Sequence, residues 1–102
     1  MKHIGNGISF DIKSLCSNYA DLTIDDFILV PSNITFYSTA GSRGDWKSHR
    51  ATLNLQKNYD NTNGVLTAYA KVSLEYMGIN GYWGYNVVSK NCAVNVFIIN
   101  QV

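Results

Sequence analysis

A strict alternation marks residues 66–76, which read LTAYAKVSLEY. The even-numbered positions are apolar or aromatic, and the odd-numbered positions carry Thr, Tyr, Lys, Ser and Glu. Because successive side chains of a β-strand point to opposite faces, this period of two predicts a long strand with one buried face and one face in water. The stretch therefore indicates a β-sheet protein.

Shorter alternating or apolar runs flank this stretch and predict its partners. We expect seven strands, at residues 7–13, 22–30, 34–39, 51–55, 66–76, 82–88 and 92–99. Turn-forming residues separate them at 40–45, 58–64, 78–81 and 89–91, and residues 14–20 are expected to form a short helical turn or a loop. Pro31 ends the second strand, because proline cannot donate to a ladder. The prediction is an all-β, single-domain sandwich or small barrel of mostly antiparallel strands with a C-terminal meander.

Length and composition agree with this fold class. The chain has 102 residues and 46% hydrophobic residues, which suits one domain with one core. Its polar residues are mostly uncharged, since Glu75 is the single glutamate beside twelve asparagines. The composition is thus rich in residues that favour strands and turns and poor in the glutamate that is common on helix surfaces, which favours an all-β fold.

The net charge narrows the possible partners. A formal charge of +1 supplies no electrostatic excess for a nucleic-acid backbone or an anionic membrane. The longest apolar runs are far shorter than the roughly 20 residues that span a bilayer. We therefore expect no nucleic acid among the partners and no membrane span.

Two cysteines, Cys16 and Cys92, lie near opposite ends of the chain. A disulfide between them would stabilise the fold by roughly 4 to 5 kcal/mol in the chain-entropy model, and we predict that it forms. The alternative is a pair of buried free thiols. Residues 1–7 lack the apolar stretch of a signal peptide, which leaves a cytosolic protein or a mature chain that starts at Met1. The Asn-rich, Glu-poor composition favours a secreted or extracytoplasmic protein.

The sequence offers little for catalysis. Its two histidines are His3 and His49, and neighbouring Ser48 would point to the opposite face of a strand from His49. The pair Asp25 and Asp26 is typical of a solvated strand edge, and a small hydrolase lacks an obvious acid–base pair. No His, Cys and carboxylate cluster has the spacing of a metal site. We expect no enzyme activity, no cofactor and no metal.

Two loops combine aromatic rings with amides, which can donate and accept hydrogen bonds together. Function is often carried by loops on a rigid β scaffold, so we predict a ligand site in each. The first consists of Arg43, Asp45, Trp46 and Asn61, and the second of Tyr82, Trp83 and Asn86. A structural alternative stays open for each site: Trp46 packs beneath a solvated turn, and Trp83 with Tyr85 anchors the core.

Three short motifs also show a family resemblance: GDWKS at 44–48, TLNL at 52–55 and YDNTNGVL at 59–66. Together they resemble one repeat of the cyanovirin-N type of lectin, over about residues 16–66. The resemblance implies recognition of mannose-type glycans without catalysis or cofactor. The resulting prediction is a non-enzymatic, lectin-like carbohydrate-binding module.

The alternative function is a secreted protein-interaction domain, such as an effector, inhibitor or adhesion subunit. Its partner would be a protein, bound by the same Tyr, Trp and Arg residues as interface anchors. The two functions predict different shapes. A sugar site is a shallow groove with an aromatic ring and converging amides, whereas a protein site is a wider flat patch or an unpaired strand edge.

Overall fold

Strands make up most of the computed structural model, which describes residues 1–34, 46–78 and 85–99, with the backbone alone at 46–49, 76–78 and 85–88. The elements within these ranges follow in this order: β1 Lys2–Gly7, β2 Ser9–Asp11, α1 Ile12–Leu15, η1 Tyr19–Asp21, η2 Ile24–Asp26, β3 Phe27–Pro31, β4 Trp46–Asp60, β5 Val65–Gly78, β6 Tyr85–Cys92 and β7 Val94–Ile98. Both η elements are single 3-10 turns. The predicted all-β fold class is confirmed.

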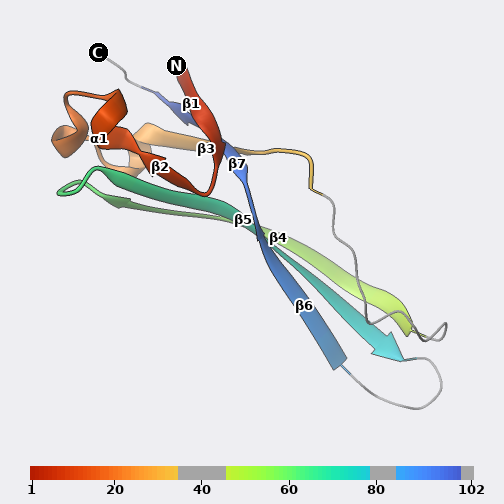
Figure 1. Cartoon of the computed structure of the whole chain (residues 1–102). Helices are drawn as coiled ribbons and strands as arrows, with labels where there is room; N and C mark the ends of the chain where they lie inside the picture. The colour runs from red at the N-terminus through yellow and green to blue at the C-terminus, as the bar shows by residue number, and fades with distance from the viewer. Residues whose placement is uncertain (35–45, 79–84, 100–102) are drawn as a thin grey trace.

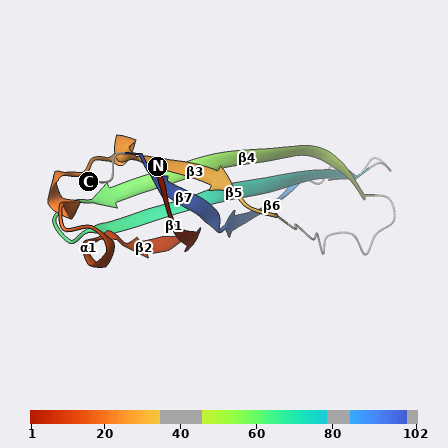
Figure 2. The ribbon, with the colours of Figure 1, turned by 90° about the horizontal axis from the view of Figure 1, so that it is seen from above.

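The strands form two antiparallel sheets. Sheet A has the order β1-β7-β3, and sheet B has the order β2-β5-β4, with β6 also paired to β5. Sheet A lies against one end of sheet B, and β4, β5 and β6 continue beyond it as an arm (Figures 1 and 2). The molecule is correspondingly elongated, with extents of 59 × 22 × 17 Å. We call the end covered by sheet A the packed end.

The core fills the space between the two sheets at the packed end. Strand β5 contributes Leu66, Ala68 and Ala70, all fully buried, in agreement with the predicted alternation. The same period of two brings inward-facing side chains from β7 of sheet A. The buried core consists of Phe10, Ile12, Cys16, Leu22, Phe27, Leu66, Ala68, Ala70, Val94, Val96 and Ile98.

A tight turn at residues 61–64 joins β4 to β5 and attaches this hairpin to α1. Gly64 has φ +67°, a left-handed conformation that favours glycine. Its carbonyl oxygen accepts hydrogen bonds from the backbone N–H groups of Ile12 at 2.8 Å and Lys13 at 3.1 Å. Asp60 caps the turn by accepting from the backbone N–H of Asn63 at 3.2 Å. The turn thereby positions the whole arm relative to the N-terminal segment.

The predicted first strand at residues 7–13 is interrupted at Ile8 and ends two residues too late. Strand β1 ends at Gly7, and only Ser9–Asp11 forms β2. The Asp11 carboxylate then accepts a hydrogen bond from the backbone N–H of Ser14, which starts the short helix α1. Ile12 consequently reaches the core from a helix and not from a strand.

The predicted second strand at residues 22–30 is too long. Thr23 and Asp26 form a reciprocal capping box around a 3-10 turn, so the strand begins at Phe27. Pro31 is the last residue of β3, an edge strand of sheet A, as the sequence predicts. The expected strand at 34–39 and the loop at 40–45 lie almost wholly outside the described residues.

The predicted C-terminal meander is also wrong. Residues 89–91 are not a turn, because Ser89 pairs with Ser73 and Asn91 pairs with Lys71 inside the sheet. The chain passes from β6 in sheet B across Ala93 into β7 in sheet A, where β7 pairs with β1 and β3. The Ser-Lys-Asn stretch has turn-like residue types because it lies exposed in the sheet.

The predicted disulfide does not form, and Cys16 and Cys92 are both free thiols. Cys16 directly follows α1, which is hydrogen-bonded through Ile12 to Gly64 beside the Val65–Leu66 start of β5, whereas Cys92 pairs with Ala70, at least four residues further along that strand. Four residues along a strand correspond to about 13 Å. A disulfide requires Cα atoms within roughly 7 Å, so the two cysteines pack into different parts of the core.

Candidate functional site

Of the seven predicted site residues, the structure describes Asn61 and the backbone of Trp46 and Asn86. Arg43, Asp45, Tyr82 and Trp83 lie outside the described residues. Asn61 lies in the 61–64 turn, where its amide donates to the Ala20 carbonyl at 3.5 Å.

Trp46 begins β4 at the far end of the arm, so the 15 residues of that strand, about 50 Å, separate it from Asn61. Asn86 of β6 pairs with Tyr76, next to the Trp46 and Gly78 pair along β5. The backbone therefore brings Trp46 and Asn86, one from each predicted patch, to the same end of the arm.

A different cluster of uncharged polar side chains covers the outer face of sheet B. Every second residue of β4 lies there exposed, and each is paired across to a polar or aromatic residue of β5. We call this surface the polar face; its β4 members are Thr52, Asn54, Gln56 and Asn58, and their β5 partners are Ser73, Lys71, Tyr69 and Thr67. Lys71 is the single charged residue among these eight. The Asn-rich, Glu-poor composition is thus concentrated on one surface.

Near the packed end, the polar face is hollowed around Tyr69. The cavity there has a volume of about 390 Å³ and is lined by Gln56, Lys57, Asn58, Thr67 and Tyr69. Tyr69 pairs directly with Gln56, and Thr67 pairs with Asn58. Amides and a hydroxyl that can donate and accept hydrogen bonds therefore surround a half-buried aromatic ring.

A second polar cavity, of about 310 Å³, lies where the chain changes sheets. Asn6, Ser32, Asn33, Lys90 and Asn91 line it. The Ser32 hydroxyl donates to the Ala93 carbonyl at 3.2 Å, which fastens the end of β3 to the sheet switch. None of the described residues that line this cavity is aromatic, so these residues offer no flat apolar surface for a sugar ring to stack on.

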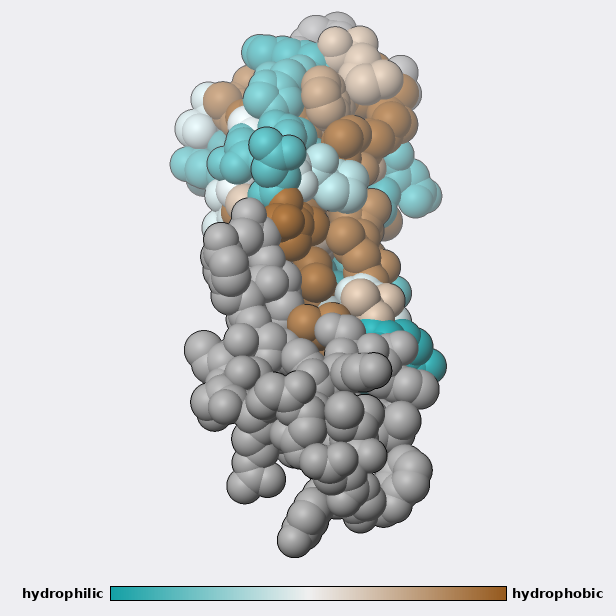
Figure 3. Space-filling model, turned by 90° about the vertical axis from the view of Figure 1, so that its right-hand side faces the viewer, coloured by the Kyte–Doolittle hydropathy of each residue, from teal (hydrophilic) through white to brown (hydrophobic). Residues whose placement is uncertain are grey.

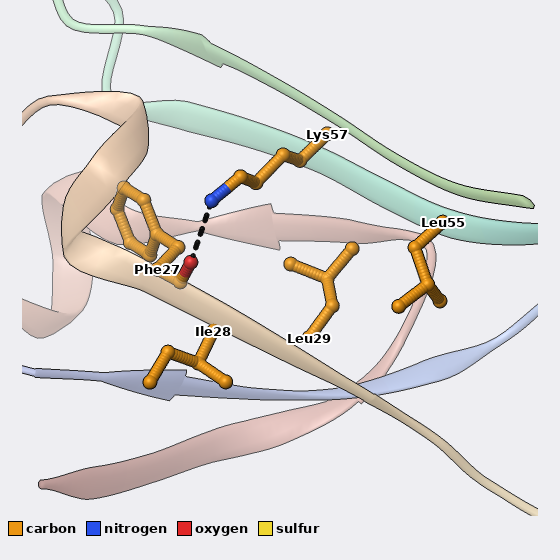
Figure 4. Close-up of a pocket in the computed structure, with 5 residues that line it drawn as sticks. All are labelled: Phe27, Ile28, Leu29, Leu55 and Lys57. Carbon is orange, nitrogen blue, oxygen red and sulfur yellow. Dashed lines mark hydrogen bonds between the residues drawn. The ribbon is translucent and has the colours of Figure 1, made fainter.

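The opposite, apolar face of sheet B opens at the edge formed by β3 and β4. A cavity of about 260 Å³ lies there between Phe27, Ile28, Leu29, Leu55 and Lys57 (Figure 4). The Lys57 ammonium donates to the Phe27 carbonyl at 2.9 Å, so its aliphatic stem crosses from one sheet to the other. Leu53 and Leu55 of β4 are 47% and 44% exposed. Apolar surface is visible between the packed end and the arm in Figure 3.

Two titratable groups at the base of the arm have shifted pKa values for structural reasons. Burial raises the pKa of Tyr59, whose hydroxyl donates to the Tyr19 carbonyl at 2.5 Å. Hydrogen bonds from the Asn63 side chain and backbone lower the pKa of Asp60. Both groups hold the β4–β5 turn against the N-terminal segment. Across the described ranges, no three His, Cys, Asp or Glu side chains gather as a metal-binding group would.

The described helices include none that is long and apolar enough to cross a membrane. The sequence matches no protein-family model, and neither the curated proteins nor the solved structures contain a match to it. The resemblance to cyanovirin-N-type lectins stays a prediction.

Proposed function

We propose that this protein is a non-enzymatic carbohydrate-binding module that holds its ligand in the hollow around Tyr69 on the polar face. The observation that supports the proposal is the half-buried Tyr69 ring between Gln56, Asn58 and Thr67. A sugar ring presents an apolar side to an aromatic ring and hydroxyls to amides. The side chains around Tyr69 match both requirements.

The size and charge of the hollow agree with this ligand class. Its volume of about 390 Å³ lies at the lower end of the range of small-molecule sites, roughly 300 to 1,000 Å³. Lys57 is the single charged residue of its lining, and its ammonium is bonded to the Phe27 carbonyl on the other side of the sheet. The hollow therefore favours a neutral, hydroxyl-rich ligand.

A glycan array followed by titration calorimetry tests this proposal. Tyr69→Ala is expected to weaken binding of the best glycan at least about tenfold, since loss of one stacked aromatic contact costs on the order of 1.4 kcal/mol. Tyr69→Phe keeps the ring and is expected to retain most of the affinity. Ser73→Ala, on the same face but outside the hollow, is the matched control.

Three results would contradict the proposal or the site. An array on which the folded protein binds no glycan would reject carbohydrate as the ligand. Unchanged affinity in Tyr69→Ala would place the sugar elsewhere on the molecule. An equal loss in Ser73→Ala would show that the variants act through the fold, which circular dichroism checks independently.

The second candidate function is the protein-interaction module. The specific observation in its favour is the long β4 strand, which pairs with β5 alone among the described strands and displays Leu53 and Leu55. This is the unpaired strand edge on which proteins recognise extended partners. A protein that binds no glycan but captures a strand along β4 would fit this second candidate.

A further inference from the structure

The outer edge of β4 is the longest strand edge that the described residues leave without a partner strand. Strand β4 runs from Trp46 to Asp60, and within the described ranges it pairs only with β5. Natural edge strands are commonly protected by proline, bulges, charged side chains or short length. Strand β4 contains no proline, and its single register shift lies between Ser48 and Arg50, so residues 50–60 form a regular edge. Such an edge is a template for another strand.

The sequence of this edge is complementary to itself when two copies run antiparallel. With a two-fold axis at Leu55, position 50 faces position 60 of the second copy. Arg50 donates to both carboxylate oxygens of Glu75 at 2.9 Å and keeps 62% of its side chain exposed. In this register it lies opposite the exposed Asp60 of the second copy, whose carboxylate also accepts hydrogen bonds from Thr62 and Asn63 of its own turn. The symmetry forms this pair of opposite charges twice. Opposite charges across neighbouring strands stabilise the pairing, and here they flank it at both ends.

The residues between these charges also match. On the polar side, Thr52 faces Asn58 and Asn54 faces Gln56, all of them uncharged and exposed hydrogen-bonding side chains. On the apolar side, Leu53 faces the stem of Lys57, whose ammonium already donates to the Phe27 carbonyl. No like charges oppose each other in this register.

The two-fold axis itself falls on an exposed leucine. Leu55 is 44% exposed at the mouth of the cavity with Phe27 and Leu29 (Figure 4). In the paired arrangement, Leu55 of each copy covers the other at this mouth. Both exposed leucines of β4 thereby lose contact with water. Burial of these side chains adds a hydrophobic contribution to the free energy of association, beside that of the backbone hydrogen bonds.

We propose that the protein forms a symmetric homodimer by antiparallel pairing of β4 with β4 of a second copy, centred on Leu55. Such a two-fold interface uses the same patch on both chains, as most homodimers do. The pairing joins the two sheets B into one continuous sheet, with both polar faces on the same side. The proposal stands on the β4 edge and is independent of the proposed sugar ligand.

Sedimentation equilibrium of the purified chain tests the dimer without any glycan. The expected mass is twice 11.4 kDa at concentrations up to about 200 μM, above the micromolar dissociation constants of weak pairs. Leu55→Lys is expected to give a monomer. Leu15→Lys changes a leucine of similar exposure, 45%, in α1 and away from β4, and is expected to remain a dimer. A monomeric wild type, or a dimer that Leu55→Lys leaves intact, overturns the proposal.

Cysteine cross-linking tests the register. In a Cys92→Ser background, Leu55→Cys brings two thiols face to face, with Cα atoms about 4.5 to 5.5 Å apart, which is within disulfide reach. Leu53→Cys is the matched control, because residue 53 faces residue 57 and the two cysteines lie about 13 Å apart along the strands. We expect oxidation to give a covalent dimer of Leu55→Cys alone. Equal cross-linking of Leu53→Cys overturns the register centred on Leu55.

Discussion

The two halves of β5 carry the same alternation and have different surroundings. At the packed end, Leu66, Ala68 and Ala70 are fully buried under sheet A. Further along the same face, Val72 and Leu74 are only half-buried, because β4, β5 and β6 extend beyond sheet A there. Periodicity thus reports which face of a strand is apolar. Whether a second sheet covers that face depends on where other strands end.

The difference also separates two sources of stability. The packed end gains the burial of whole apolar side chains, roughly 1.5 to 3 kcal/mol for each large one. The arm depends on backbone pairing and on cross-strand side-chain pairs worth roughly 0.2 to 1 kcal/mol each. The arm can therefore present exposed side chains, such as Leu53 and Leu55, at little cost to the fold.

The largest expected effect compares two leucines on the same face of sheet B. Leu66→Ala, in the packed end, is expected to lower the free energy of unfolding by about 3 to 5 kcal/mol, since it leaves a cavity in the core. Leu53→Ala, in the arm, is expected to cost less than about 1 kcal/mol in the isolated chain, because its side chain is half exposed. Urea unfolding of dilute protein measures both. Equal losses would show that the arm is as tightly packed as the core.

The next effect concerns the turn that joins the arm to α1. Gly64→Ala is expected to cost roughly 2 to 4 kcal/mol, because alanine is strained at φ +67° and its Cβ would lie 2.9 Å from the Lys13 backbone nitrogen. Gly7→Ala is the control, since a Cβ there meets only Phe10 at 3.8 Å. Thermal unfolding compares the two. If Gly64→Ala unfolded at the same temperature as Gly7→Ala, the turn would not be what holds the arm in place.

The smallest effect is the acid sensitivity of the same turn. Hydrogen bonds from Asn63 hold the pKa of Asp60 below its ordinary value of 3.8, so ionised Asp60 stabilises the folded state above that pH. The stabilisation by ionised Asp60 is lost as the pH falls through the lowered pKa that Asp60 has in the folded state. Asn63→Ala removes the 2.7 Å side-chain bond and is expected to raise the pKa of Asp60 toward the ordinary value, as measured by NMR titration. An unchanged pKa would show that the backbone N–H groups suffice.

Several elements of the fold were predictable because their physics is local. Alternation along 66–76 and 92–99 predicts the buried face of β5 and most of β7, and turn residues predict the turn that ends at Gly64. The failures arise where two local signals compete. Asp11 in an alternating segment caps a helix, and Ser89 with its neighbours combines turn-like residue types with a place in an exposed strand.

The candidate site was harder to predict than the fold. Aromatic and amide residue types favour a site in the loops that contain tryptophans, whereas the hollow around Tyr69 lies on two strands. Alternation already assigns Tyr69 and Thr67 to the wet face of β5. Their juxtaposition with Gln56 and Asn58 depends on the register of β4 against β5, which the turn at 61–64 sets.

By itself, the sequence determined the class of fold, the inward and outward faces of the long strands, and a surface rich in uncharged polar groups. All three features follow from the chemistry of the side chains and from their alternation along each strand. Both depend only on residues that are close neighbours in the sequence. Only the tertiary structure decided that Cys16 and Cys92 stay apart, that the chain crosses from one sheet to the other at Ala93, and that β4 pairs with β5 alone among the described strands. Each of these depends on contacts between segments distant in sequence, and no local pattern encodes which segments will meet.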